Sequence, residues 1–125
     1  MLYPGRVVFV VDDEKTISAT VAMILKASGY DARCFFDPVS ALQAAQFLAP
    51  DLLLSDVMMP KMNGIELAIQ VTQSCANCRV LLFSGHISTS DLLDAAVLQG
   101  HQFEILAKPV HPRELLEKLD EMFAA

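Results

Sequence analysis

The sequence predicts an α/β fold in which a parallel sheet of the doubly wound (βα)5 type lies between two layers of helices, three layers in all. Three observations predict it. Five short apolar runs are typical of buried parallel strands, amphipathic helical patterns separate them, and the two kinds of segment alternate strictly. With 125 residues, the chain fits one domain, 1–125, large enough to bury a core without disulfides.

The predicted strands are runs of aliphatic and aromatic residues without a helical period. They cover RVVFVV at 6–11, ARCFF at 32–36, DLLLS at 51–55, RVLLFS at 79–84 and FEILA at 103–107. Strands of a parallel sheet are buried on both faces, so continuous apolar runs are expected rather than alternating patterns.

The first two helices are predicted from apolar spacing and end signals. The first covers 15–28, where apolar residues recur at helical spacing, and Gly29 offers a left-handed stop. Asp37 and Pro38 are typical of an N-cap followed by proline at the first helical position. A second helix is therefore expected from this pair through about residue 48.

Three more helices complete the pattern. Asn63, with Glu66 three residues later, resembles a capping box that begins the third helix. Residues 88–99 carry the fourth helical pattern. The last covers 112–123 and begins at Pro112, a favoured residue for the first turn.

The composition excludes several classes of protein. Apolar residues make up 54% of the chain, which indicates a folded globular protein. Nine Lys and Arg residues against 15 Asp and Glu give a net charge of −6, which disfavours direct binding to nucleic acid. The apolar run near the start, VVFVV at 7–11, is too short for a membrane span or a secretion signal. We therefore expect a cytoplasmic protein without membrane insertion.

The cysteines predict no metal or redox centre. The chain has three, Cys34, Cys75 and Cys78, and an odd number without an export signal indicates reduced thiols. Cys75 and Cys78 have CxxC spacing, but they follow a helical pattern, whereas a redox pair sits at a helix N-terminus. No second pair is present to complete a zinc site. A structural or incidental role is expected.

Polar side chains mark the ends of four predicted strands. Asp12 and Asp13 follow the first strand, Asp56 follows the third, Ser84 ends the fourth and Lys108 follows the fifth. The carboxyl ends of parallel strands share one edge of the sheet, so a strand order of 2-1-3-4-5 brings these groups to one crevice. Alone, each residue has a simpler explanation as a helix cap, a turn residue or a solvated side chain. Their coincidence favours a shared site.

This set of groups suits phosphoryl transfer. Carboxylates that lie close together repel one another unless a cation neutralises them, and their oxygens suit Mg²⁺. Lys108 and the Ser84 hydroxyl supply donors for a second anionic group. A metal, a lysine and a hydroxyl around one carboxylate provide charge neutralisation and positioning for phosphoryl transfer to it. Asp56 is therefore the predicted nucleophile.

Four segments together resemble the receiver domain of two-component response regulators. They are VVFVVDDE at 7–14, LLLSDVMMPKMNGIEL at 52–67, LLFSGH at 81–86 and LAKPV at 106–110. The resemblance covers essentially the whole chain and implies a flavodoxin-like fold. Because the order 2-1-3-4-5 is already known for the chemotaxis regulators of this family, it is an agreement and no independent result.

The resemblance implies a phosphoacceptor signalling domain, which at most catalyses its own phosphorylation and dephosphorylation. Asp56 would accept a phosphoryl group from a histidine kinase or a phosphotransfer protein. Asp13 and Asp56 would bind Mg²⁺ together with the backbone carbonyl of Met58, and Asp12 would act mainly through a bound water. Met58 and Gly85, beside the site, would affect how water reaches the phosphoryl group.

The resemblance also implies how the signal is read. Lys108 would pair with the phosphoryl oxygens and Ser84 would turn toward them, while the bond between Lys108 and Pro109 is expected to be cis. Three residues before the lysine the family commonly has Tyr or Phe. Here Ile105 occupies that position, which puts the aromatic switch in doubt, and Phe103 is a weak substitute.

The sequence leaves the output and two alternative functions open. An effector protein is expected to bind a face within 88–123, and a phosphorylation-dependent dimer is left open. VVDDEKT also loosely matches the opening of haloacid-dehalogenase-like phosphatases with Asp12 as nucleophile, but the expected acidic pair after Lys108 is missing. A degenerate receiver that acts only in docking would have lost its acceptor site, whose residues are all present here.

Overall fold

The structure, a computed structural model, contains a five-stranded parallel sheet. It describes residues 5–85, 94, 97, 100 and 103–124. The strands are β1 (Val7–Val11), β2 (Asp31–Phe35), β3 (Leu52–Asp56), β4 (Arg79–Ser84) and β5 (Glu104–Ala107). Their order is β2-β1-β3-β4-β5, and every neighbouring pair is parallel. The predicted fold class and strand order are confirmed.

The third strand lies one residue further along than predicted. Asp51 precedes β3, where its Oδ2 accepts a hydrogen bond of 2.7 Å from the N–H of Val7 and its own N–H donates to the Val7 carbonyl at 2.8 Å. Asp56 is consequently the last residue of the strand, paired with Phe83 of β4. The acceptor candidate is thus held by the sheet itself rather than by the loop that follows.

The described helices are α1 (Lys15–Ala27), α2 (Pro38–Ala45), α3 (Gly64–Ser74) and α5 (Pro112–Ala124). As predicted, α1 is followed by Gly29 at a φ of 93°. The second helix ends at Ala45, earlier than the predicted residue 48, and the backbone N–H groups of Phe47 and Leu48 both donate to the Ala44 carbonyl in the turn that follows. Of the fourth predicted helix, 88–99, only positions 94 and 97 are described, and both are helical.

The caps predicted for α2 and α3 are present. The Asp37 carboxylate accepts hydrogen bonds from the backbone N–H of Ser40 at 2.9 Å and from its hydroxyl at 2.7 Å. Asn63 Oδ1 accepts from the backbone N–H of Glu66 at 2.8 Å, but the Glu66 carboxylate returns to the Asn63 side-chain amide rather than to its backbone. The resemblance to a capping box is therefore only partial.

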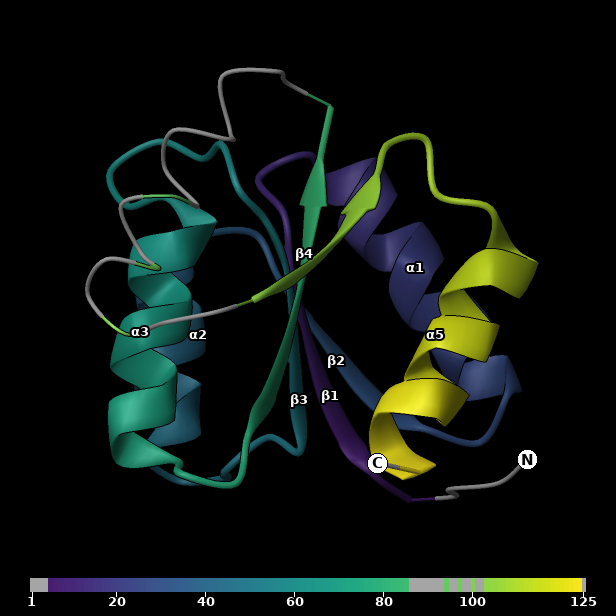
Figure 1. The fold of residues 1–125 in the computed structure, drawn as a ribbon, viewed down its shortest axis with the longest axis horizontal. Coiled ribbons are helices and arrows are strands. Elements are labelled where there is room, and N and C mark those ends of the chain that lie inside the picture. The colour runs from purple at the N-terminus through teal and green to yellow at the C-terminus, as the bar shows by residue number, and fades with distance from the viewer. Residues whose placement is uncertain (1–4, 86–93, 95–96, 98–99, 101–102, 125) are drawn as a thin grey trace.

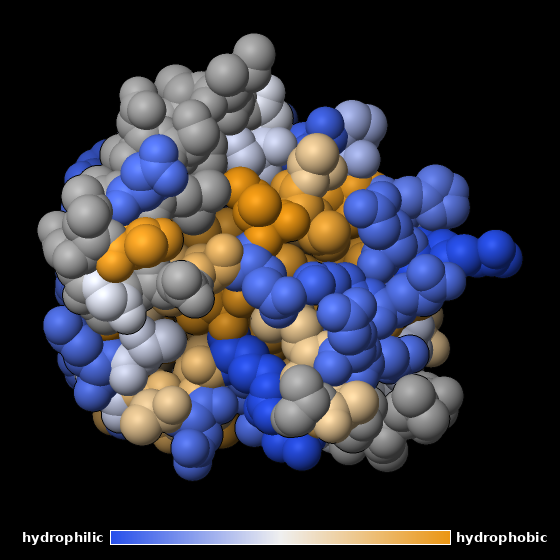
Figure 2. Space-filling model, viewed as in Figure 1, coloured by the Kyte–Doolittle hydropathy of each residue, from blue (hydrophilic) through white to orange (hydrophobic). Residues whose placement is uncertain are grey.

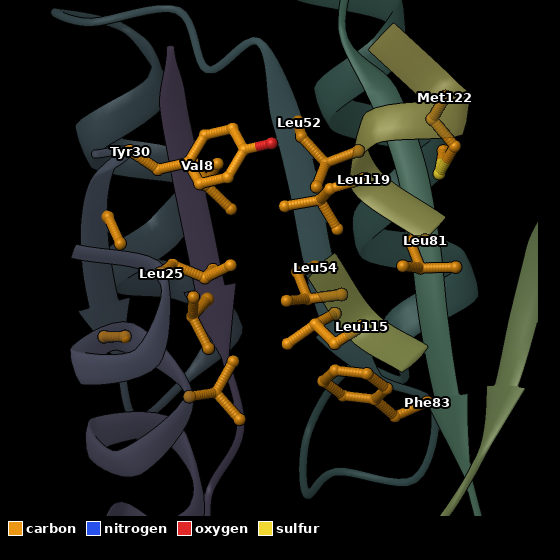
Figure 3. Close-up of a cluster of buried hydrophobic side chains, with 14 of the residues drawn as sticks. Val8, Leu25, Tyr30, Leu52, Leu54, Leu81, Phe83, Leu115, Leu119 and Met122 are labelled. Atoms are coloured by element: carbon orange, nitrogen blue, oxygen red, sulfur yellow. The ribbon is translucent and has the colours of Figure 1, made fainter. Parts of the chain in front are cut away.

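Two layers of helices enclose the sheet, with α1 and α5 on one face and α2 and α3 on the other (Figure 1). Strand residues alternate between the two sides, so that Val8 and Val10 point toward α1 and α5 while Phe9 and Val11 point toward α2 and α3. On the first side, Leu115 and Leu119 of α5 pack beside the leucines of β3 (Figure 3). We call the two groups of buried residues the α1–α5 core and the α2–α3 core.

No helix within the described ranges has the length and apolar character required to cross a bilayer.

Asp37→Ala is expected to lower the free energy of unfolding by about 1 kcal/mol at neutral pH, because the backbone N–H of Ser40 loses its acceptor. The hydrogen bonds from the Ser40 backbone and then from its hydroxyl hold the pKa of Asp37 below its ordinary value. The cap is therefore complete above the unfolded-state pKa of about 3.9 and is lost as the pH falls through the lower folded-state value.

Denaturant titrations at neutral and acid pH measure this cap. The matched control is Asp37→Asn, which keeps an acceptor oxygen without the charge and should stay close to wild type at neutral pH. Equal stability of wild type and Asp37→Ala at neutral pH would show that the cap does not stabilise α2.

Candidate functional site

The polar groups predicted at the strand ends lie together at the carboxyl edge of the sheet. Carboxylate oxygens of Asp12, Asp13 and Asp56 all lie within 4.8 Å of one another. Lys108 follows β5, which is separated from β1 by β4 and β3. Its long side chain extends along the sheet edge as far as Asp56 and Asp12. Ser84 ends β4, and its carbonyl accepts a hydrogen bond of 2.9 Å from the backbone N–H of Lys108. The sheet edge therefore brings the predicted residues into one site.

Lys108 is the cation at the centre of this arrangement. Its Nζ lies 3.1 Å from Asp12 Oδ2 and 3.3 Å from Asp56 Oδ2. Its side chain is largely buried, and the peptide bond to Pro109 is cis, as expected from the resemblance. One lysine therefore bridges two carboxylates, one that directly follows β1 and one that ends β3.

Asp12 has both a local and a long-range role. It is buried, and its Oδ1 accepts a hydrogen bond of 2.9 Å from the backbone N–H of Glu14 at the start of α1. Its other oxygen, Oδ2, holds Lys108. Oδ1 thus closes a local turn just before α1, whose N-cap Glu14 has no side-chain cap hydrogen bond, so Asp12 is not a helix cap. Oδ2 supports the site explanation.

The site contains more negatively than positively charged side chains. Burial raises the pKa of Asp56, the charges of Asp12 and Asp13 raise it further, and Lys108 opposes them. Burial alone would lower the pKa of Lys108, but the hydrogen bond to Asp12 and the charge of Asp56 outweigh it and raise the pKa. Lys108 therefore stays charged, and one cation faces three carboxylates.

The donor set fits a hard divalent cation. Carboxylate oxygens at this spacing are what Mg²⁺ binds in proteins. Burial and then repulsion from Asp12 and Asp13 raise the pKa of Asp56, and a bound cation would relieve that repulsion. Asp13 is the most accessible of the three carboxylates, which suits a ligand that meets a partly hydrated ion. Met58, whose carbonyl is the further predicted ligand, lies two residues beyond Asp56 with an exposed side chain.

Two residues that support Asp56 were not predicted from the sequence. The buried hydroxyl of Ser55 donates a hydrogen bond of 2.9 Å to the Asp56 carbonyl. Gly64, the first residue of α3, approaches so closely that a Cβ there would overlap the Asp56 carbonyl oxygen. Its N–H also donates to the Val57 carbonyl at 2.8 Å. The available signal was a glycine at a helix start where a better helix former would otherwise be expected.

A groove of about 490 Å³ opens beside Lys108, between α1 and the segment that leads into α5. Its walls are mostly apolar and include Ile17 and Ile24 of α1, Phe83 of β4 and Val110. The groove adjoins the site without containing its carboxylates.

Two positions that were predicted to take part in signal output, Phe103 and Ile105, lie just before and within β5. Ile105 has an exposed side chain, and Figure 2 shows hydrophobic residues at the surface along the course of this strand. Phe103, the proposed substitute for an aromatic switch, packs instead against the α2–α3 core. Most of the predicted effector-binding segment before β5 lies outside the described residues.

Cys75 and Cys78 lie far from this site, at the end of α3 and the start of β4. Both are free thiols, buried against the α2–α3 core. Burial, followed by the neighbouring Cys75, raises the pKa of the Cys78 thiol to about 12. A thiol that stays protonated is a poor nucleophile and metal ligand, which supports the predicted structural role.

Comparison with known proteins matches residues 8–120 to the family described as the response regulator receiver domain. The chain is similar to the DNA-binding response regulator MtrA of Mycobacterium tuberculosis, with 29% identity over 112 residues that make up 90% of this chain and 48% of that protein. It thus spans about half the length of this curated relative.

Two solved structures show the same fold. Chemotaxis protein CheY4 of Vibrio cholerae is 28% identical, with a TM-score of 0.83 over 94% of this chain and 98% of that one. A CheY-like receiver domain protein of Methanospirillum hungatei is 25% identical, with a TM-score of 0.86 over 96% of this chain and 94% of that one.

Proposed function

Because this chain belongs to the response regulator receiver domain family, and is therefore a signalling domain of a two-component system, we propose that Asp56 is its phosphoacceptor. The observation that carries this proposal is the bridge from Lys108 to Asp12 and Asp56, which places a charged donor 3.3 Å from the Asp56 carboxylate. The domain that we propose covers 1–125.

The proposed reaction transfers a phosphoryl group from a phosphohistidine to an oxygen of Asp56. The bond from phosphorus to the donor nitrogen breaks as the bond to the carboxylate oxygen forms. Asp12, Asp13 and Asp56, with the Met58 carbonyl, would hold Mg²⁺, which supplies charge neutralisation when bound. Lys108 is positioned to pair with oxygens of a phosphoryl group on Asp56, and Ser55 and Gly64 fix the acceptor's backbone.

The partners follow from this role. A histidine kinase or phosphotransfer protein is the proposed donor, and we place its apolar contacts in the groove beside Lys108, whose Nζ contacts the Asp56 carboxylate. Ser84 would then report the phosphoryl group to an effector-binding face within 88–123, with Ile105 at its centre in place of an aromatic switch. We also propose that the domain catalyses at most its own phosphorylation and dephosphorylation. The cytoplasmic location and the absence of direct nucleic-acid binding stay predictions.

The phosphatase alternative, with Asp12 as nucleophile, is disfavoured by the hydrogen bonds of that side chain. Both Asp12 oxygens accept a hydrogen bond, Oδ1 from the Glu14 N–H and Oδ2 from Lys108, which lowers the nucleophilicity of that carboxylate. A docking-only receiver would have no need for converging acceptor-site groups. The three functions predict different modified residues. The proposed receiver carries the phosphoryl group on Asp56, the phosphatase carries it on Asp12, and the docking module carries none.

The decisive experiment is intact-mass measurement after incubation with a small acyl phosphate, with and without Mg²⁺. We expect one Mg²⁺-dependent phosphoryl adduct on wild type and none on Asp56→Asn. Asp51→Asn, which alters an aspartate at the opposite edge of the sheet, is the control and should behave as wild type. Borohydride reduction followed by peptide mapping identifies the modified residue. Modification mapped to Asp12 would support the phosphatase, and no adduct under any condition would support the docking module.

A further inference from the structure

The outer face of α2 and α3 lacks the charges expected of a solvated surface. Neither 38–50 nor 67–78 contains a single Asp, Glu, Lys or Arg, although charged residues make up 19% of the chain. The exposed positions within these two ranges carry Gln, Ser, Asn, Ala and apolar residues instead, and the exposed Glu66 lies outside them, in the first turn of α3. A helix face that remains in water normally carries charged side chains. This uncharged α2–α3 face is therefore suited to contact with another protein surface.

Two features lie side by side on this face, near the amino edge of the sheet. The first is a groove of about 240 Å³ between α2 and α3, whose lining includes Leu42, Gln46, Gln70, Val71, Gln73 and Ser74. None of the described residues that line it is charged. The second is Phe47, which directly follows Gln46 and is 90% exposed. The groove is therefore large enough to admit an aromatic side chain, and an exposed phenylalanine directly follows one of its lining residues.

We propose that the chain self-associates through the α2–α3 face as a two-fold symmetric dimer, in which Phe47 of each copy enters the groove of the other. A two-fold interface uses the same patch on both copies, so anchor and groove must lie on one face, as they do here. Aromatic anchors in pockets are the usual energetic centre of protein interfaces.

The charge distribution favours a second copy as the occupant. The chain carries a net charge of −6, so most of its surfaces repel a second copy. The α2–α3 face allows approach without placing like charges opposite each other, and its glutamines can hydrogen-bond across the interface. The contact is small, so the affinity should be in the weak range of small interfaces.

This association goes beyond the proposed function and does not depend on it. Phe47 lies between α2 and the start of β3, at the sheet edge opposite to Asp56. The α2–α3 face is also on the other side of the sheet from α5, so it is separate from much of the proposed effector face. Dimerisation is therefore expected in the unphosphorylated protein, and in Asp56→Asn to the same extent.

Sedimentation equilibrium of the full chain over a wide concentration range tests the proposal. We expect a reversible dimer that is weakened roughly tenfold or more by Phe47→Ser, which removes the anchor, or by Gln73→Arg, which places a charge in the groove. Met23→Ser is the matched control, since Met23 is 68% exposed but lies on α1, and this variant should dimerise as wild type. All three positions are exposed, so thermal melts should confirm intact folding.

A mixing experiment distinguishes this geometry from other dimers. The Phe47→Ser copy keeps an intact groove, and the Gln73→Arg copy keeps its Phe47, so an equimolar mixture can form one of the two contacts. The mixture is expected to associate more tightly than either variant alone. A monomer at every concentration, association that survives either substitution, or a mixture no tighter than its components would overturn the proposal.

Discussion

Gly64→Ala is expected to lower the free energy of unfolding by about 3 kcal/mol or more, since overpacking against rigid backbone is among the costly core changes. The new Cβ would overlap the Asp56 carbonyl oxygen and would lie 3.0 Å from both the Asp56 carbonyl carbon and the Ser55 hydroxyl. Two of these three atoms belong to the backbone, and the Ser55 hydroxyl is held by its hydrogen bond to the Asp56 carbonyl. The start of α3 must therefore move away from β3, which strains the hydrogen bond from the Gly64 N–H to Val57.

Chemical denaturation followed by circular dichroism measures this loss, and Gly85→Ala is its control. Among the residues that the structure describes, a Cβ on Gly85 would meet only the Lys108 Cβ at 3.6 Å, an ordinary van der Waals contact, so this variant should stay near wild type. If Gly64→Ala and Gly85→Ala were equally stable, the close approach of α3 to the acceptor strand would not constrain the fold.

Lys108→Met is expected to reduce both stability and phosphoryl uptake. Without Mg²⁺, it leaves the buried carboxylates of Asp12 and Asp56 without their cation, at a cost of about 3 kcal/mol. Added Mg²⁺ should recover part of this loss. Uptake from a small acyl phosphate should slow roughly a hundredfold even at saturating Mg²⁺, because the charged donor for the phosphoryl oxygens is gone.

The stability loss has a defined pH dependence. Losing Lys108 removes the charge that opposes the rise and raises the pKa of Asp56 in the folded state further, so the destabilisation is present at neutral pH, where the unfolded chain favours the ionised carboxylate. It should fade as the pH drops toward the ordinary aspartate value of about 3.9, below which the carboxyl groups are protonated in both states. Urea titrations across this range measure the difference from wild type.

Lys118→Met is the matched control for this substitution. The Lys118 and Lys108 side chains are 20% and 21% exposed, and each contacts two carboxylates. The partners of Lys118, Glu104 and Glu121, are exposed to solvent, where ion pairs contribute less than about 1 kcal/mol. A similar loss for both lysines would mean that burial of the aspartates does not amplify the effect of Lys108.

The residues at the strand ends were predictable from the sequence because they depend on topology. Asp12, Asp56 and Lys108 are far apart in the chain, but strict alternation of strands and helices requires a parallel sheet, which collects its carboxyl ends at one edge. The caps Asp37 and Asn63 were predictable for a different reason, since a cap bonds only to its own helix. Both kinds of prediction use short-range chemistry or a rule of chain connectivity.

The features that escaped prediction depend on distances between elements that no sequence pattern encodes. The overlap that constrains Gly64 exists only because α3 starts against β3. The use of both Asp12 oxygens requires the placement of Glu14 and Lys108 together. Lys61 takes a positive φ of 73° between β3 and α3, although its sequence carries no glycine or asparagine signal at that position. The end of α2 at Ala45 likewise depends on where the chain must turn toward β3.

The sheet divides the interior into the α1–α5 core and the α2–α3 core, which have no side chain in common. Repacking on one side is therefore transmitted to the other only through strand backbone, and substitutions in separate groups combine nearly additively. In evolutionary terms, the two sides of the domain can diverge at different rates. A lineage can change its contacts on one side while the aspartates and the lysine at the sheet edge keep their positions.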